Sequence, residues 1–268
     1  MQLSDLLQAN IVLPSIPKVI ALLLHELEQS EPDLKTITQL IRTDPALTTR
    51  LLHTANASFF KLSGQVNSAS EALAILGLSH IHAMAAQAAS ATSLKAVPGL
   101  NLQQFWDYSL NVAKLARSLA GVVRQNQGAA FTCGMVHAVG ELVMHLAMPQ
   151  DMAKLNQQLD PLDLKRADLE VKAFAYCYAQ VGAGYARRWL FPQAIVDALE
   201  HQHAPFENDV YEPLAGVIHL ASWRVRARQA KLNDQALAVT FPGAVGDALG
   251  LDIDMVLQQD PFDWGSRT

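Results

Sequence analysis

The sequence predicts an all-α protein, and three observations support this fold class. Apolar residues recur at helical spacing along most of the chain, helix start signals precede several of these runs, and strand-type alternation is nearly absent. Half of the 268 residues are hydrophobic and only 17% are charged, which excludes a disordered chain. A chain of this length buries roughly 70–75% of its unfolded surface, so it can form a large core.

The first half of the chain carries the clearest helix signals. Residues 16–27 place apolar side chains at i, i+3 and i+4, which predicts a helix with one buried face. Asp44-Pro45 predicts the next start, since Asp caps free N–H groups and Pro fits the first helical position. Ser68-Ala69-Ser70-Glu71 predicts another start as a capping box, and Gly77 predicts the end of that helix.

The second half is predicted to consist of consecutive helices, and Pro149 is expected to end the helix at 129–147. Helices are expected at about residues 103–124, 129–147, 161–175, 178–190, 192–202 and 212–231, with shorter ones at 243–250 and 252–260. The linker-like stretch 95–99 divides the chain into an N-terminal helical half (1–98), a C-terminal helical half (99–231) and a helical tail (232–268). The linker is short, so we expect the N-terminal bundle to pack on the C-terminal half.

Charge and cysteine content narrow the class of partner and compartment. The net charge of −5 does not favour a nucleic-acid partner, and the basic run Arg224, Arg226, Arg228 and Lys231 is interpreted as a solvated helix face. Cys133 and Cys177 form no CxxC pair, so we expect two buried thiols in a reducing compartment. A basic leader and an uninterrupted apolar run of about 20 residues are both lacking. These features predict a soluble cytoplasmic protein with no membrane partner.

Distinctive motifs are spread over residues 10–230. They occupy residues 13–17, 44–48, 50–52, 55–57, 59–60, 68–78, 105–106, 134–141 and 189–192. In their order and spacing, these segments resemble the HDOD domain of bacterial signalling proteins. The resemblance implies an all-α, HD-like architecture and a role in signal transduction through other signalling proteins.

The resemblance also implies a descent from metal-dependent HD phosphohydrolases, which hold a divalent ion with a His, a His-Asp pair and a later Asp. Such an ion lowers the pKa of a bound water and polarises a phosphoryl oxygen. In this chain His137 is kept, but Ala138, Tyr108 and Ser222 stand at the other three positions. Gln202 precedes His203 where the family has a His-His pair, and Tyr178 stands where it often has a His. A single imidazole does not hold magnesium or manganese, which prefer oxygen ligands.

We therefore expect a non-catalytic interaction domain with no metal and no cofactor. The expected vestigial pocket consists of Tyr108, His137, Ala138, Glu141, Gln202, His203 and Ser222. A predicted helix is followed by Asn56, Phe59 and Phe60, which can be interpreted in two ways. Asn can close the helix end while the aromatic rings anchor a loop, or the aromatic rings can form an exposed contact for a partner protein.

Two alternatives remain open at this point. The first is a divergent metal-dependent phosphohydrolase or phosphodiesterase, with a site rebuilt from His137, Glu141, His203 and His219. The second is a small-ligand response, with a cyclic dinucleotide bound in the old cleft. Nucleophilic and nucleotide-binding motifs such as GxSxG, GxxxxGK[ST] and GxGxxG do not occur in the sequence.

Overall fold

The computed structural model describes residues 1–58, 65–91, 96–206 and 211–260, and these residues form helices without a β-strand. This confirms the predicted all-α class. The N-terminal half contains α1 (Leu3–Gln8), α2 (Pro17–Leu27), α3 (Leu34–Ile41), α4 (Pro45–Ser58) and α5 (Ala69–Ala91). The C-terminal half contains α6 (Leu102–Val122), α7 (Gln127–Val136), α8 (Val139–Ala147), α9 (Pro149–Asn156), α10 (Arg166–Phe174), α11 (Tyr178–Arg188), α12 (Gln193–His201) and α13 (Pro213–Gln229). The tail contains α14 (Asp234–Thr240), α15 (Gly243–Leu249) and α16 (Ile253–Gln258).

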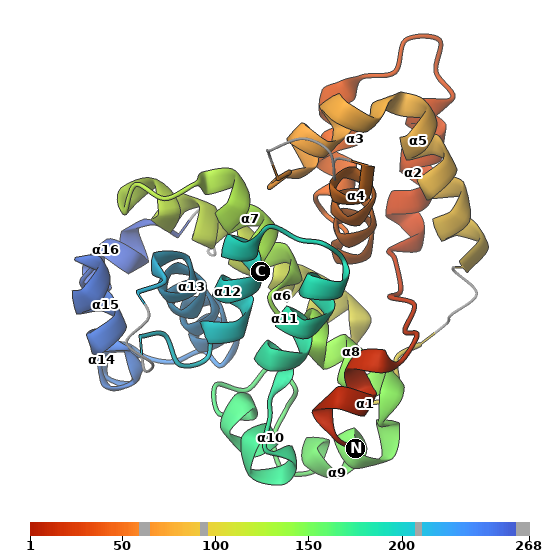
Figure 1. Ribbon diagram of the computed structural model, residues 1–268. Helices are drawn as coiled ribbons and strands as arrows, with labels where there is room; N and C mark the ends of the chain where they lie inside the picture. Colours follow the sequence, from red (N-terminus) through yellow and green to blue (C-terminus); the bar gives the residue numbers. More distant parts are fainter. Residues whose placement is uncertain (59–64, 92–95, 207–210, 261–268) are drawn as a thin grey trace.

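In the N-terminal half, α2 to α5 pack into one bundle (Figure 1). Asp44 organises it, because its fully buried carboxylate accepts N–H bonds from Ala46 at 2.8 Å and Leu47 at 2.9 Å. These bonds cap the start of α4 as the sequence predicted. The same carboxylate accepts the N–H of Ile16 at 2.6 Å, so it also fixes the segment that leads into α2.

The start of α5 is the predicted capping box. Ser68 Oγ lies 2.9 Å from one Glu71 carboxylate oxygen, and the other oxygen accepts the backbone N–H of Asn67 at 2.9 Å. Gly77 leaves helical conformation with φ 74° and ψ 169°, which favours glycine. Gly77 thus ends the first helical segment as predicted, and a second segment begins beyond this kink and continues to Ala91 within α5.

The C-terminal half is built on very close helix contacts at glycines. A Cβ at Gly134 would lie 2.4 Å from the Cα of Ala113 on α6, and one at Gly140 would lie 2.0 Å from the carbonyl oxygen of Tyr178 on α11. The expected single helix over 129–147 is wrong, since the chain turns at His137 and Ala138 between α7 and α8. This turn lets α7 pack on α6 while α8 packs on α11.

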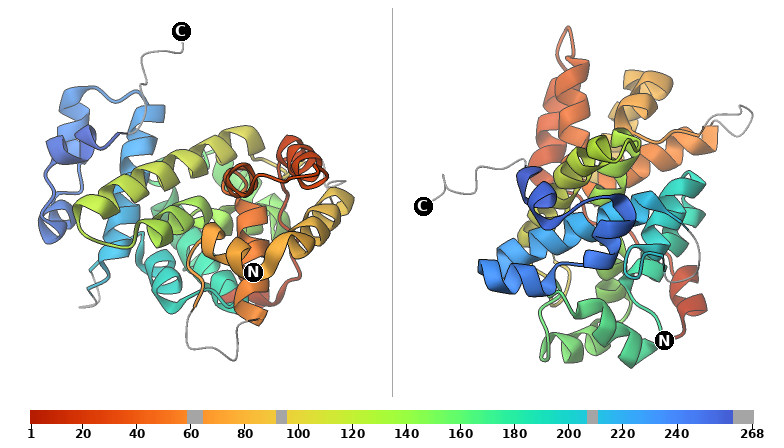
Figure 2. Two further views of the ribbon diagram at one scale, coloured as in Figure 1. Left: turned by 90° about the horizontal axis from the view of Figure 1, so that it is seen from above. Right: turned by 90° about the vertical axis from the view of Figure 1, so that its left-hand side faces the viewer.

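The chain ends attach to the C-terminal half. Although α1 falls within the expected N-terminal range, it packs on α11, where Tyr185 Oη donates to the carbonyl oxygens of Leu6 and Ala9. The tail lies against α13, on the side away from α2 and α3 (Figure 2). Asp252 caps α16 by accepting the N–H of Met255 at 2.7 Å, in agreement with the helical tail that the sequence predicted.

Two parts of the basic run are not on a solvated face. Arg224 and Arg226 are 8% and 6% exposed, so the sequence interpretation is wrong for both. Arg224 Nη2 pairs with Asp260 Oδ2 at 2.8 Å, because the tail folds back over α13. Cys133 and Cys177 are buried free thiols as expected, and burial raises the pKa of both.

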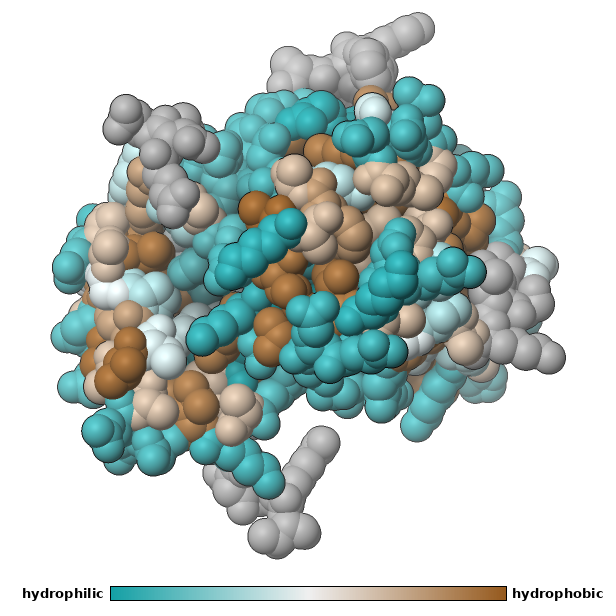
Figure 3. Space-filling model, turned by 90° about the horizontal axis from the view of Figure 1, so that it is seen from below, coloured by the Kyte–Doolittle hydropathy of each residue, from teal (hydrophilic) through white to brown (hydrophobic). Residues whose placement is uncertain are grey.

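The surface is mostly hydrophilic, but apolar side chains reach it in places. The face seen from below in Figure 1 shows apolar residues near its centre, crossed by hydrophilic side chains (Figure 3). Two helical stretches have the length and hydropathy of a membrane span, namely Ala69–Ser90 and Gln127–Ala147. In the most apolar window of each stretch, 94% of the residues are buried in the second but only 33% in the first, whose exposed positions are mainly Ala, Ser and His.

The Gly140 contact gives a direct stability test. Gly140→Ala should lower the free energy of unfolding by about 3 kcal/mol, because the added methyl would meet backbone atoms that cannot move independently. Gly243→Ala is the matched control, since a Cβ there meets nothing within 4 Å at the start of α15. Urea unfolding should show an unchanged midpoint for the control and a clearly lower one for Gly140→Ala. Equal midpoints would contradict the packing described for α8 and α11.

Candidate functional site

The positions that the resemblance assigned to metal ligands lie together at the centre of the C-terminal half. Tyr108 on α6 is fully buried, and its Oη lies 2.8 Å from Ser222 Oγ on α13. The His137 ring stands edge-on to the Tyr108 ring, with centroids 4.9 Å apart. Ala138 is buried beside them. The fold thus brings these four positions into one pocket, although only one of them is still an HD-type ligand.

A guanidinium group from α13 occupies this pocket. Arg226 lies one helical turn after Ser222, and its Nε donates to Tyr108 Oη at 2.8 Å. Its Nη1 donates to the Asp163 carbonyl oxygen at 3.1 Å, and its Nη2 lies 3.3 Å from Tyr178 Oη. Because an arginine nitrogen can only donate, the Tyr108 oxygen accepts this bond, and either hydroxyl can donate in the Tyr108–Ser222 pair.

Aromatic rings further stabilise this buried cation. The Arg226 Cζ lies 5.5 Å from the ring centroids of both Tyr108 and Tyr178, which is within cation–π range. Burial on its own would lower the pKa of Arg226, but the neighbouring tyrosine oxygens and Glu141 raise it, so the group keeps its charge. Burial raises the pKa of Tyr178, which therefore stays a neutral phenol.

His137 is a neutral imidazole in a fixed orientation. Its Nδ1 donates to the Gly134 carbonyl oxygen at 2.6 Å, so Nε2 carries the lone pair. Among the described residues, His137 Nε2 has no hydrogen-bond partner. Burial lowers the pKa of His137 to about 3, and the charge of Arg226 acts in the same direction.

Glu141 belongs to a second buried cluster. Arg166 Nη2 lies 3.1 Å from Glu141 Oε1, and Arg166 Nε donates to Glu170 Oε1 at 2.9 Å. Burial and the neighbouring Glu170 raise the pKa of Glu141 well above its ordinary value. The other oxygen of Glu170 accepts the backbone N–H of Tyr178 at 2.8 Å, so this cluster also holds the start of α11. Glu170 is thus held by two hydrogen bonds, whereas Glu141 is held by its charge contact with Arg166 and neither of its oxygens makes a hydrogen bond among the described residues.

The remaining predicted residues have separate partners. Gln202 Nε2 donates to the His137 carbonyl oxygen at 3.0 Å, which fixes the end of α12 on the turn between α7 and α8. His203 is 30% exposed and its Nε2 lies 3.2 Å from Asp168 Oδ1. His219 Nδ1 donates to the Gln202 carbonyl oxygen at 2.8 Å. In the described part of the chain, no three His, Cys, Asp or Glu side chains are grouped as metal ligands would be.

A cavity of about 310 Å³ opens from the vestigial pocket toward the surface. It is lined by Tyr178, Gln202, Ser222 and Arg226 at its inner end, together with residues such as Lys165, His203, His219 and Trp223. Its size is at the lower end of the range for small-ligand sites. The arrangement offers cations and aromatic rings to a ligand, and its Arg226 charge favours an anion over a metal cation.

Of the three interaction candidates, Asn56 lies within the described residues, near the end of α4. Asn56 is 7% exposed, and its amide pairs with the backbone of Val66 by donating at 3.2 Å and accepting at 2.9 Å. These bonds join the last turn of α4 to the segment before α5. Phe59 and Phe60 lie outside the described residues.

Sequence reasoning missed Arg226, Arg166 and Glu170. All three lie on helices that the sequence predicted, but an amphipathic pattern assigns charged residues to the solvent side. One signal was available: Arg226 follows Ser222 by four residues, so it shares a helix face with a position assigned to the pocket.

Comparisons with known proteins agree with the HDOD resemblance that the sequence motifs indicated. The family model of the HDOD domain matches residues 13–205. A curated protein of Treponema pallidum is 24% identical over 217 residues, which are 80% of this chain but 42% of that protein. The chain therefore spans less than half the length of this relative.

Solved structures share the fold over nearly the whole chain. The response regulator MmoQ of Methylococcus capsulatus is 24% identical with a TM-score of 0.74, and the alignment covers 93% of this chain and 98% of that one. A candidate phosphohydrolase of Shewanella amazonensis is 25% identical with a TM-score of 0.55 and coverage of 96% and 92%. A virulence factor of Campylobacter jejuni is 17% identical with a TM-score of 0.67 and coverage of 97% of both chains. The family model spans most of the chain, and this chain belongs to the HDOD domain family, a signalling-related group with an HD-like helical fold.

Proposed function

We propose that this chain is a non-catalytic, cytoplasmic signalling domain of a bacterium that acts by binding other signalling proteins. The observation that carries the proposal is the Arg226 guanidinium, which hydrogen-bonds Tyr108 in the middle of the former ligand positions. HD-type hydrolysis needs a divalent ion there, and the protein supplies its own cation instead.

Charge repulsion supports the loss of catalysis. A divalent ion placed about 4 Å from a guanidinium would be repelled by on the order of 8 kcal/mol at an effective dielectric constant near 20. Carboxylates normally offset such repulsion, but Ala138 and Ser222 offer none, and Glu141 is paired with Arg166. The neutral imidazole of His137 cannot compensate for this alone.

The outward face of α5 supports the interaction role. Its exposed positions are mainly Ala, Ser and His, and Ile75 is the one large apolar side chain among them, at 39% exposed. A face with so little charge and such small side chains costs little to desolvate against a partner protein. The inward face of α5 packs on α2 and α4, so the bundle presents this surface on a firm support.

Metal content tests the proposal. Purified protein dialysed against Mn²⁺ should retain far less than one ion per chain and should not hydrolyse a phosphodiester. The variant Tyr108→His/Ala138→Asp/Ser222→Asp should still bind poorly, whereas the same variant with Arg226→Gln should gain Mn²⁺, because only then is the cation removed. Elemental analysis provides the measurement, with circular dichroism to check folding. A stoichiometric ion in the wild type that is lost in His137→Ala would support the phosphohydrolase alternative instead.

The cavity beside the pocket favours one further candidate, a response to a cyclic dinucleotide. Lys165 and Arg226 would meet its phosphates, and Trp223 offers an aromatic surface to a base. If this response exists, cyclic di-GMP should raise the melting temperature of the wild type but not that of Lys165→Gln. Differential scanning fluorimetry measures this shift. Unchanged melting in both proteins would leave protein binding as the sole candidate role.

The proposed structural role of His137 predicts a distinct pH dependence. Below pH 6.5 the unfolded chain gains a proton at this position, but the folded protein does not until about pH 3, so the wild type loses stability as pH falls through that window. The variant His137→Gln lacks the imidazole and therefore this pH-dependent loss of stability. The stability difference between wild type and variant should therefore shift by about 2 kcal/mol between pH 7.5 and pH 5, to the disadvantage of the wild type.

Urea unfolding at the two pH values measures this shift. His82→Gln, the same change at an exposed position of α5, serves as the control. A difference between wild type and His137→Gln that stays constant over this range would show that His137 is not held neutral by burial.

A further inference from the structure

A second cleft lies between the two halves, away from the vestigial pocket. From the N-terminal half it is lined by Arg42 at the end of α3, Thr48 on α4, and residues 68–70 at the start of α5. From the C-terminal half it is lined by Arg117 on α6 and by Gln127, Gly128, Phe131 and Thr132 on α7. We call this set the arginine cleft. Its volume is about 170 Å³, several times the roughly 30 Å³ that one water occupies in the liquid.

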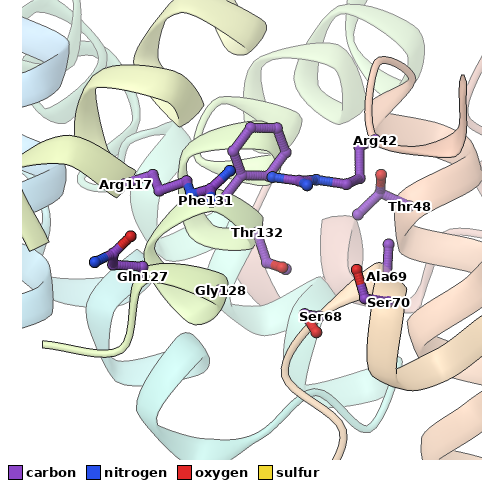
Figure 4. A pocket seen from close by; sticks show the side chains of 10 residues that line it. All are labelled: Arg42, Thr48, Ser68, Ala69, Ser70, Arg117, Gln127, Gly128, Phe131 and Thr132. Carbon is purple, nitrogen blue, oxygen red and sulfur yellow. The ribbon is translucent and has the colours of Figure 1, made fainter. Parts of the chain in front are cut away.

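The two arginines converge on one aromatic ring. Figure 4 shows the side chains of Arg42 and Arg117 reaching toward Phe131 from opposite sides of the cleft. The Arg42 guanidinium lies 3.9 Å from the centre of the Phe131 ring, which holds it in place by stacking. Arg117 is exposed and makes no ion pair with any described residue. Both cations are thus presented to the space between the halves.

No acidic residue offsets these charges within the cleft. Its described lining contains two arginines, several hydroxyl and amide groups, and neither Asp nor Glu. Burial and then the charge of Arg117 lower the pKa of Arg42, which shows that the two guanidinium groups repel each other. Arg42 is half-buried and Arg117 is exposed, so water screens part of this repulsion, and the described lining supplies no carboxylate to offset the remainder. An anion bound between them would relieve the repulsion.

Ser70 supplies the hydroxyl group that the cleft can offer to a phosphate (Figure 4). The hydroxyl of Ser68 donates to Glu71 and that of Thr48 to the Ile41 carbonyl oxygen. Thr132 Oγ1 donates to the Asn67 carbonyl oxygen at 2.8 Å, which ties α7 to the segment before α5 and keeps the two walls together. Glu71 lies near this segment, but its carboxylate is held by Ser68 and by the backbone of Asn67, outside the lining.

The cleft continues into a shallower hollow of about 380 Å³ along α6. This hollow shares Arg117, Gln127 and Phe131 with the cleft and extends to Lys114 and Ser118. Its described lining also contains no acidic residue. A ligand could therefore place phosphate groups between the arginines and an attached organic part in the hollow.

We propose that the arginine cleft binds a small molecule carrying a diphosphate group, held by the guanidinium groups of Arg42 and Arg117. Arginine suits this role because its planar fork donates two parallel hydrogen bonds to phosphate oxygens. Since the walls come from different halves, the bound ligand fastens the N-terminal bundle to the C-terminal half. The site is separate from the vestigial pocket and does not depend on the proposed interaction role.

Calorimetric titration with inorganic pyrophosphate tests the proposal on the full chain. The wild type should bind, and Arg117→Gln should weaken binding roughly tenfold, as expected for the loss of a charge-assisted hydrogen bond. Arg42→Gln should weaken it similarly, but it also removes the stacking on Phe131, so Arg117→Gln is the cleaner variant. Arg187→Gln is the control, because it removes the same charge from an exposed position on α11, where Arg187 pairs with Glu200.

The remaining outcomes overturn the proposal in different ways. Lack of pyrophosphate binding by the wild type would remove the site. Equal weakening in Arg117→Gln and Arg187→Gln would mean general charge attraction and not a defined cleft. A phosphoserine peptide that binds through Arg117 when pyrophosphate does not would assign the cleft to a modified partner protein and not to a free diphosphate. Pyrophosphate should also raise the melting temperature of the wild type but not of Arg117→Gln, since a bound ligand stabilises the folded state.

Discussion

Two buried guanidinium groups govern the interior of the C-terminal half. A charge removed from water is costly unless its donors are paired, so the surrounding helices must supply partners at fixed positions. Arg226 receives them from α6, α11 and the segment before α10, and Arg166 receives them from α8 and its own helix. The two networks meet at Tyr178 on α11. Its backbone N–H donates to Glu170, and its hydroxyl oxygen lies next to Arg226. The helices around the old metal position are thus held by the protein's own cations.

The backbone around this pocket is that of an HD-like fold, although most of its side chains differ from HD-type metal ligands. The helix turn at His137 and Ala138 keeps the geometry of an HD-type pocket, with Gly140 pressed against α11. Under the proposed function, such a pocket gives rigidity and not catalysis, and the proposed binding surfaces lie elsewhere, at α5 and at the cleft between the halves.

Much of the architecture was predictable from local sequence chemistry. Helix starts at Asp44-Pro45 and Ser68 depend on capping, which acts within a few residues, and both were predicted. The turn at Ala138 was not, because the surrounding residues are apolar on every side and give no helical periodicity to interrupt. The pocket positions could be located through the family resemblance. The role of Arg226 could not, because the partners that stabilise its charge are Tyr108 and Tyr178, far away in sequence.

The attachment of α1 to α11 has a consequence for how the molecule can move. The chain begins on the C-terminal half, crosses to form α2 to α5, and returns through residues 96–101 to form α6. Two covalent crossings therefore join the halves, one at 9–16 and one after α5, where a simple tandem arrangement would have one. Hinge-like separation would have to stretch both crossings or peel α1 away from Tyr185. Because both crossings connect the halves, moving the halves apart costs more free energy than twisting or sliding them against each other.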